Sequence, residues 1–341
     1  MMYSVYIMSD KTLIFYLTAC DRYFIFDKFI DEINKCSVDT IDKLHLLIVN
    51  SSPDMTYYES KLTKQKIQYT CVHVPCPQNN YLPKVKYAIN FGLTNNFKYT
   101  FKCDNDFIIT HYTMDYIIQN ISLLDSKYLT LSPNISTGMP SVEYFIDEAF
   151  TKDESEQIRD EFKKCKFNLQ PGVFDYRGLH QPGGKWDYKQ FFNQLTNLPT
   201  WYKGAHPVRY GFGNDMINDL IIKHKTDIFQ KKDCSVIEGD ISYFANMGFF
   251  INTQIYHKLI NVEKLTINGC DDIPLNRYGW KHNLKHGIIS HGYAIHIAYG
   301  WRWCLNNTQS GHQYVDIDCP TKTLIEYEEQ FINKLYVTDS I

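Results

Sequence analysis

The segment of residues 82–106, LPKVKYAINFGLTNNFKYTFKCDND, contains the clearest signals of secondary structure in the sequence. Its first half predicts a helix, because Leu82-Pro83 suits a first helical turn. Small or apolar residues then recur at the spacing of one helix face: Val85, Ala88, Ile89 and Gly92. Its second half predicts a strand over residues 99–103 that runs directly into Asp104-Asn105-Asp106. We therefore expect a helix followed by a strand with an acidic end.

The same alternation of helices and strands continues toward the N-terminus. Residues 13–17 and 44–49 are short apolar runs that predict strands, and residues 67–74 alternate as a third strand. Residues 26–33 carry Phe and Ile at helical spacing. This order is typical of an α/β protein with a Rossmann-like, mainly parallel sheet covered by helices. Such sheets bind ligands beyond the carboxyl ends of their strands. We expect a ligand site in the loops that follow these strands.

The middle of the chain breaks this rhythm. Residues 143–166 form a charged stretch that predicts a surface helix, and residues 171–213 are dense in Gly, Pro and aromatic residues. We interpret the second segment as part of a large aromatic-rich insertion, because long loops in compact enzymes are usually binding elements or lids.

Composition narrows the class of protein. The 341 residues carry a formal net charge of -3, which predicts no broad basic surface for nucleic acid. No apolar run approaches the roughly 20 residues of a membrane span, and residues 1–10 lack the pattern of a secretory signal. The ten cysteines include no CxxC pair, which favours free thiols in the cytoplasm over five disulfides in a secreted protein. The heavy use of Asn, Lys, Ile and Tyr is typical of an AT-rich genome, that of a virus or of an AT-rich microbe. For a virus, the cytoplasm would be that of the host.

The two carboxylates of Asp104 and Asp106 indicate a cation site. Residues i and i+2 of an extended segment point the same way, so both side chains could reach one ion. Mg²⁺ and Mn²⁺ prefer oxygen ligands and often join carboxylates to substrate phosphates. The sequence has no glycine-rich phosphate loop, which favours a cation as the means of neutralising a phosphate. The alternative is a solvated turn with Asp and Asn as turn formers.

These residues together resemble the GT-A class of nucleotide-sugar-dependent glycosyltransferases, especially the large inverting family that includes cellulose and chitin synthases. The resemblance extends over residues 13–303, interrupted by the insertion. It rests on the loops after the first two strands, the helix over residues 84–92, the D-x-D motif Asp104-Asn105-Asp106 and a late acidic pair, Asp271-Asp272. It implies transfer of a sugar, most readily from a UDP-sugar, to a hydroxyl of a glycan, a protein or another acceptor.

The late acidic pair implies a catalytic base. In that family the second acid of such a pair takes the acceptor proton, which assigns the role to Asp272 with Asp271 beside it. An acceptor hydroxyl has a high pKa and needs a carboxylate within hydrogen-bond reach. The alternative is the capped start of a helix, with Pro274 just inside. A retaining mechanism also stays open, because an Asp-Asp pair is not diagnostic of inversion.

A histidine is implied as the third metal ligand. Several GT-A families carry one near the end of the catalytic region, often with Gly and a basic residue after it, and His296 is followed by Gly300 and Arg302. Together with the two D-x-D carboxylates it would form a site better suited to Mn²⁺ than to Mg²⁺. His291 is the second choice for this ligand. The alternative is a hydrogen-bonded core histidine on an apolar strand.

The resemblance also implies residues that bind the donor and the acceptor. Those implied for the nucleotide are Thr18, Ala19, Arg22, Asn50, Asp54, Lys84, Asp104 and Asn105. Those implied for the donor sugar and the acceptor are Asn246, Gly248, Trp280 and Trp301. A glycine lets the backbone come close to a ligand, and a tryptophan ring can pack against a sugar. The plainer alternatives are solvated surface residues and core tryptophans.

We divide the chain by these expected roles. Residues 1–140 are interpreted as the nucleotide-sugar-binding half, residues 141–235 as an insertion or lid with the acceptor region, residues 236–310 as the catalytic and acceptor half, and residues 311–341 as a C-terminal tail or helix. Two other functions remain open: a transferase of the same fold that acts on hydroxymethylpyrimidine bases of DNA, and a catalytically inactive carbohydrate-binding protein. The near-neutral charge is unfavourable for a DNA acceptor.

Overall fold

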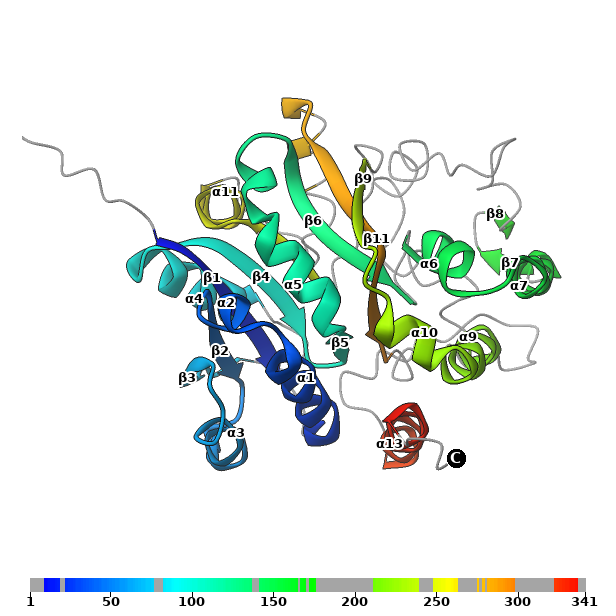
Figure 1. The fold of residues 1–341 in the computed structure, drawn as a ribbon, viewed down its shortest axis with the longest axis horizontal. Coiled ribbons are helices and arrows are strands. Elements are labelled where there is room, and N and C mark those ends of the chain that lie inside the picture. The colour runs from blue at the N-terminus through cyan, green and yellow to red at the C-terminus, as the bar shows by residue number, and fades with distance from the viewer. Residues whose placement is uncertain are drawn as a thin grey trace, which may run out of the picture.

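The structure is a computed structural model that describes residues 9–18, 22–76, 82–136, 141–164, 166–169, 172–175, 211–238, 248–262, 275, 278–279, 281–297 and 322–336. Within these residues one large sheet is flanked by helices (Figure 1). A separate two-stranded sheet pairs β7 (Lys166–Leu169) with β8 (Gly172–Asp175).

The large sheet has nine strands in the described part of the chain. Its order is β3-β2-β1-β4-β10-β6-β11-β5, with β9 paired to β11. Six of the strands run in one direction, and β10, β5 and β9 run in the other. The prediction of a mainly parallel α/β sheet is confirmed. The strands are β1 (Ser9–Thr18), β2 (Leu44–Asn50), β3 (Gln68–His73), β4 (Phe97–Asp104), β5 (Phe107–Ile109), β6 (Tyr128–Ile135), β9 (Ser235–Glu238), β10 (Gly248–Asn252) and β11 (Lys285–His296).

Helices cover both faces of this sheet because each has one apolar stripe to bury. On one face lie α1 (Tyr23–Lys35), α2 (Val38–Ile41), α3 (Thr56–Leu62) and α5 (His111–Gln119), followed by the short helix η1 (Ile121–Asp125). On the other face lie α4 (Leu82–Thr94), α11 (Thr253–His257) and η5 (Lys258–Val262). The helices predicted over residues 26–33 and from Leu82 onward are thus confirmed as α1 and α4.

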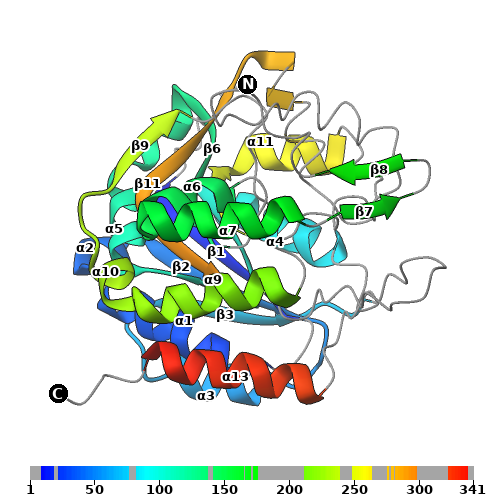
Figure 2. The ribbon, with the colours of Figure 1, turned by 90° about the vertical axis from the view of Figure 1, so that its right-hand side faces the viewer.

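The prediction of one surface helix over residues 143–166 is wrong. This stretch forms two helices, α6 (Ser141–Ala149) and α7 (Lys152–Lys164), and α6 buries Phe145 and Ile146 completely. These helices share a third apolar cluster with α9 (Gly211–Lys223), α10 (Lys225–Gln230) and α13 (Lys322–Tyr336). Figure 2 shows α7, α9 and α13 one below another on this side of the molecule. The apolar stripe of α6 was not predicted because charged residues lie between its apolar positions and follow them in α7.

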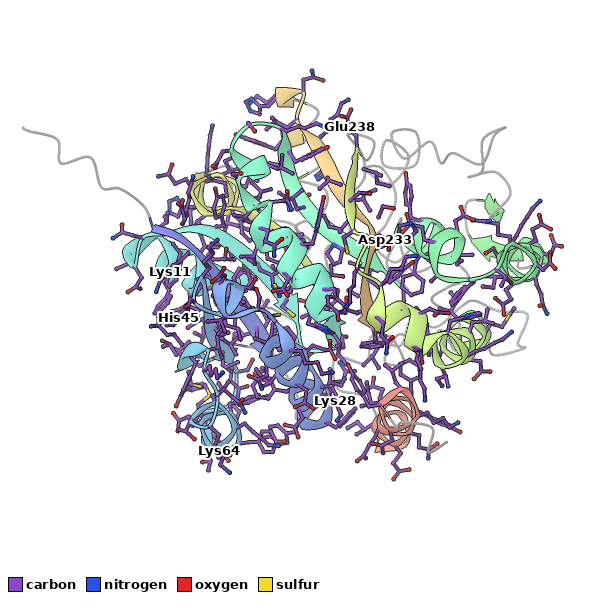
Figure 3. The ribbon with its side chains drawn as sticks, viewed as in Figure 1. Lys11, Lys28, His45, Lys64, Asp233 and Glu238 are labelled. Carbon is purple, nitrogen blue, oxygen red and sulfur yellow. The ribbon has the colours of Figure 1, made fainter. Side chains whose placement is uncertain are left out.

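The C-terminal helix α13 packs against the first helix of the chain. Lys28 on α1 lies with its Nζ 4.9 Å from the centre of the Tyr336 ring, and Figure 3 shows Lys28 beside α13. The apolar side of α13 buries Phe331, Ile332 and Leu335 in the third cluster. Helix α13 is therefore an integral part of the fold.

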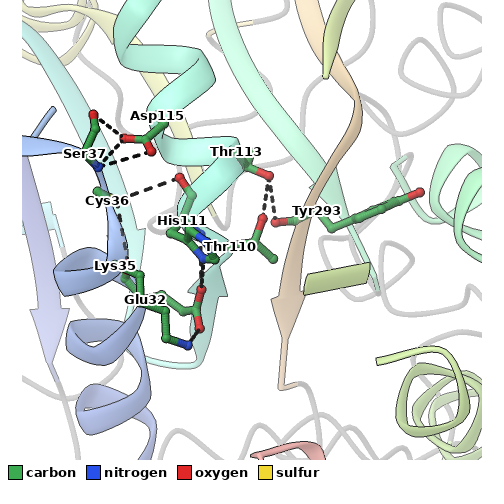
Figure 4. Close-up of polar contacts among 9 residues, drawn as sticks. All are labelled: Glu32, Lys35, Cys36, Ser37, Thr110, His111, Thr113, Asp115 and Tyr293. Atoms are coloured by element: carbon green, nitrogen blue, oxygen red, sulfur yellow. Dashed lines mark hydrogen bonds and ion pairs between the residues drawn. The ribbon is translucent and has the colours of Figure 1, made fainter. Parts of the chain in front are cut away.

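A buried carboxylate fastens α1 to α5 (Figure 4). Glu32 accepts a hydrogen bond from the backbone N–H of His111 at 3.1 Å and lies 2.6 Å from Lys35 Nζ. Burial alone would raise the pKa of Glu32, but hydrogen bonds from His111 and Lys35 lower it. Nearby, Asp115 on α5 accepts from both the backbone N–H and the hydroxyl of Ser37, each at 3.0 Å. These contacts fix the helix that follows the first loop of the sheet.

A buried histidine makes the fold sensitive to acid. His286 on β11 has no exposed surface, its Nδ1 lies 2.7 Å from Thr130 Oγ1, and burial lowers its pKa to about 3. Between pH 3 and 6.5 the unfolded chain therefore binds a proton at this residue that the folded chain does not. The free energy of unfolding should fall, as pH drops below about 6.5, by up to about 1.4 kcal/mol per pH unit from this group.

Urea unfolding at several pH values measures this effect. The variant His286→Gln should show a shallower loss of stability between pH 6.5 and 4 than the native chain. The matched control is His282→Gln, because His282 is exposed. An unchanged pH slope in His286→Gln would contradict the assignment.

Candidate active site

The carboxyl ends of the parallel strands meet at one edge of the sheet. Thr18 ends β1 and Asn50 ends β2, and the Thr18 hydroxyl donates a hydrogen bond to Asn50 Oδ1 at 2.6 Å. Asn50 Nδ2 then donates to the carbonyl of Asp54 at 3.3 Å. Two of the residues predicted for the nucleotide, Thr18 and Asn50, thus lie in contact, and their polar groups also stabilise the loops in which they lie.

Two further predicted nucleotide residues have different surroundings. Lys84 on α4 is 1% exposed, and its Nζ donates to the carbonyl of Thr18 at 2.8 Å, so it places a buried ammonium at this edge. Asp54 is exposed and accepts the backbone N–H of Thr56 at 2.9 Å, at the start of α3. That hydrogen bond lowers the pKa of Asp54. The Asp54 carboxylate therefore binds the first backbone N–H of α3. Lys84, in contrast, contacts the end of β1.

The prediction that Asp104 and Asp106 point the same way because both lie in an extended segment is wrong. Strand β4 ends at Asp104, and Asn105 and Asp106 form a turn before β5, so the rule for alternating side chains of a strand does not apply. The turn is held by Tyr16, whose hydroxyl donates to the carbonyl of Asn105 at 3.1 Å. The Asp104 side chain is 33% exposed, and its Oδ1 lies 3.2 Å from Nζ of Lys102, which is 2% exposed. Lys102 is not among the site residues predicted from the sequence.

Asp106 is the buried carboxylate of the motif. Its Oδ2 lies 3.3 Å from Nη1 of Arg22, and its Oδ1 lies 3.4 Å from Nε2 of His296. Burial alone would raise the pKa of Asp106, but His296 and Arg22 lower that pKa to about 2. Asp106 is therefore ionised at neutral pH.

Strand pairing explains why His296 reaches a residue 190 positions earlier in the chain. In the antiparallel ladder of β11 and β5, His296 lies opposite Phe107, and the backbone N–H of Ile297 donates to the carbonyl of Asp106 at 2.7 Å. The backbone N–H of His296 donates to Oγ of Ser136, which follows β6. The structure thus brings together two of the three predicted metal ligands, Asp106 and His296.

The residues at this edge fit a divalent cation in part. Asp106 Oδ1 is buried and has no hydrogen-bond partner among the described residues, although it lies beside the His296 ring. A carboxylate oxygen and an imidazole nitrogen suit Mn²⁺. Within the described ranges, no group of three or more His, Cys, Asp or Glu side chains is placed to hold a metal ion. Asp104, the other predicted carboxylate ligand, has its Oδ1 3.2 Å from Nζ of Lys102. Protein groups would supply two ligands, and such ions commonly take their other ligands from water and phosphate oxygens.

Glu328 is a neighbour of this site that the sequence analysis missed. It lies on α13, has no exposed surface, and its Oε1 lies 2.9 Å from Nη2 of Arg22. Burial raises the pKa of Glu328 to about 7, and Asp106 adds to this effect while Arg22 opposes it. Of the two carboxyl groups that share Arg22, Asp106 thus loses its proton first. A single Glu on an amphipathic helix gives no sequence signal for such a contact.

The second-choice ligand His291 lies in a different cluster. It has a positive φ of 56° where β11 departs from regular pairing with β6, and its backbone N–H donates to Oε2 of Glu148 at 2.7 Å. Ser290 and Asn134 donate to the same carboxylate, at 2.8 and 3.0 Å. Glu148 on α6 therefore stabilises the irregular part of β11, and His291 has the contacts of a structural residue.

Gly248 lies at the same edge, at the start of β10 and opposite Cys103. A Cβ atom at this position would lie 2.5 Å from Cζ of Phe107, so the glycine permits close packing with that ring. The other residues predicted for catalysis, donor or acceptor lie outside the described residues: Ala19, Asn246, Asp271, Asp272, Trp280 and Trp301.

Gly248→Ala should therefore destabilise the protein by about 1–3 kcal/mol, because the new methyl group overpacks the Phe107 ring. Urea unfolding gives the change in the free energy of unfolding. The control is Gly92→Ala, where the nearest atoms to a new Cβ are side-chain carbons of Leu13 and Thr253 at 3.2 Å. Equal stabilities of Gly248→Ala and the native chain would contradict the packing argument.

Known proteins were compared with this chain by sequence and by structure. No family model matches the chain, and no curated protein sequence matches it. Among solved structures, S. aureus TarS 1-349 is 11% identical, with 37% of this chain and 35% of that chain covered and a TM-score of 0.30. The same protein in complex with UDP-GlcNAc is 13% identical, with 37% and 34% covered and a TM-score of 0.30. The matched part spans about a third of the length of these chains, and the architecture given above rests on the strand order itself.

No helix in the described residues is both long enough and apolar enough to cross a membrane.

Proposed function

We propose that this protein transfers a sugar from a nucleoside diphosphate sugar, most readily a UDP-sugar, to a hydroxyl of an acceptor. The observation that carries the proposal is the ionised Asp106 beside His296, at the carboxyl edge of a mainly parallel sheet. This edge is where α/β sheets bind ligands. A buried ammonium, that of Lys84, lies at the same edge and favours an anionic ligand.

Asp106 and His296 would hold a divalent cation, Mn²⁺ in preference to Mg²⁺, and Asp104 would join them if its side chain turned away from Lys102. When bound, the cation would offset the negative charge of the leaving nucleoside diphosphate. Thr18, Asn50 and Lys84 would position the nucleotide, and Arg22 would orient Asp106 through their ion pair. The acceptor stays open between a glycan, a protein and another hydroxyl compound.

Asp272 is proposed as the base that takes the acceptor proton in an inverting displacement, with Asp271 beside it. This assignment depends on the resemblance in sequence and on the chemical need for a carboxylate near the acceptor. The five described cysteines are free thiols, which supports a place in the cytoplasm: Cys36, Cys71, Cys76, Cys103 and Cys234.

One observation favours a catalytically inactive carbohydrate-binding protein as a second candidate. Both D-x-D carboxylates contact a basic side chain, Asp104 with Lys102 and Asp106 with Arg22. Such contacts would compete with a metal ion for the same oxygens. Glycan binding without any Mn²⁺-dependent binding of a nucleotide sugar would support this candidate.

A thermal-shift screen tests the main proposal. UDP-, GDP-, CMP- and dTDP-sugars are each added with and without Mn²⁺. A ligand at 100 times its Kd should stabilise the protein by about 2.7 kcal/mol, and the largest shift is expected for a UDP-sugar with Mn²⁺. The absence of a shift with all four donors would contradict the proposal.

A further inference from the structure

Arg22 lies between two buried carboxylates that come from distant parts of the chain. Its Nη1 lies 3.3 Å from Asp106 Oδ2, and its Nη2 lies 2.9 Å from Glu328 Oε1. The side chains of these three residues are at most 12% exposed. The C-terminal helix α13 therefore contributes a charge directly to the surroundings of the D-x-D motif.

The charges in this cluster do not balance when both carboxyl groups are ionised and the His296 ring is neutral, the form in which an imidazole binds a metal ion. Among the described residues the two carboxylates then share one guanidinium, that of Arg22, with the His296 ring 3.4 Å from Asp106 Oδ1. Each carboxylate also has one buried oxygen without a hydrogen-bond partner in this part of the chain: Asp106 Oδ1 and Glu328 Oε2. Burial of uncompensated negative charge is costly. A cation that binds beside Asp106 would reduce this cost, so the cluster favours one further positive charge.

The contact of Glu328 also changes what Arg22 does to Asp106. If the guanidinium of Arg22 formed an ion pair with Asp106 alone, it would neutralise that carboxylate and repel a divalent cation beside it. Because Glu328 takes part of the charge of Arg22, Asp106 keeps more of its negative charge for a cation. Helix α13 also buries Phe331, Ile332 and Leu335 in the third apolar cluster, and a change at Glu328 leaves these apolar side chains unaltered.

We propose that Glu328 sets the cation affinity of the D-x-D site by compensating the charge of Arg22. This inference rests on the metal-dependent function proposed above and adds a residue from α13 to its site. Glu328 is a positioning residue in this account, because it acts on Asp106 through Arg22 and does not itself contact the ion.

Titration of the full chain with Mn²⁺ alone, followed by calorimetry or by the EPR signal of free Mn²⁺, tests the inference without a donor or an acceptor. The titration is done at pH 8, above the pKa of about 7 of Glu328, where its carboxylate is ionised. Glu328→Gln then keeps the shape of the side chain and removes its charge, and should weaken Mn²⁺ binding about tenfold or more. The matched control is Glu329→Gln, because Glu329 is the next residue of α13 and is exposed. It should bind Mn²⁺ as the native chain does.

A double variant separates charge compensation from a structural role. Arg22→Met with Glu328→Gln removes the guanidinium together with its second carboxylate, and should return the Kd for Mn²⁺ to within about threefold of the native value, because Asp106 then faces no competing cation. A purely structural role of Glu328 predicts instead that the double variant binds more weakly than Glu328→Gln.

The outcomes distinguish the two proposals. Native affinity in Glu328→Gln, or no recovery in the double variant, would overturn the role of Glu328 while leaving the metal site in place. A native chain that binds no Mn²⁺ would overturn the metal dependence of the proposed function, and the role of Glu328 with it.

Discussion

Asp106→Asn is expected to slow the release of UDP from a UDP-sugar by about 10²- to 10³-fold. Asp106 has a pKa of about 2 and so carries a negative charge at neutral pH, next to Arg22 and His296. An amide has the same shape but no charge, so it would hold a cation poorly while leaving the turn after β4 intact. Initial rates with saturating donor, with and without Mn²⁺, measure the effect.

The control for this variant is Asp42→Asn, because Asp42 is exposed at the end of α2. Its rate should equal that of the native chain. Thermal unfolding of Asp106→Asn should remain cooperative, which shows that the fold persists. Full activity of Asp106→Asn would contradict a role of the D-x-D motif in sugar transfer.

Asp272→Asn is expected to reduce sugar transfer by about 10²- to 10⁴-fold, the usual contribution of a general base. Because the base acts on the acceptor, the thermal shift caused by a UDP-sugar with Mn²⁺ should stay as in the native chain. Product formation and the thermal shift, measured on the same preparation, separate these two effects.

Asp271→Asn is the companion variant and should lose less activity, since the base role is assigned to the second acid of the pair. Native transfer rates in Asp272→Asn would contradict that assignment. A loss of donor binding in Asp272→Asn would instead place this residue in the nucleotide site.

The sequence predicts the first half of the fold well because its signals there are local. The apolar run over residues 13–17 lies within β1, and the face of Val85, Ala88 and Ile89 is the buried face of α4. The reversed strands β10 and β5 could not be predicted in the same way, because their direction depends on pairing with β4 and β11, which are distant in sequence. The buried face of α6 was missed because its neighbouring residues are charged.

In the candidate site, too, contacts between distant parts of the chain could not be predicted from local sequence patterns. The placement of Asp106 near His296 agrees with the sequence prediction, whereas metal binding by these residues stays a prediction. Arg22, expected to bind the nucleotide, contacts Asp106. Lys102 and Glu328 were not predicted, because a single charged residue has no periodic pattern and its partner is known only from the folded chain.

We propose that the carboxyl edge beside Asp106 binds a nucleotide through a divalent cation. The decisive measurement is a crystal structure of the full chain with UDP and Mn²⁺, with anomalous scattering used to locate manganese. We expect an anomalous peak within coordination distance of Asp106 and His296, with the diphosphate of UDP on its open side. An ordered UDP away from this edge, or manganese bound elsewhere, would contradict it.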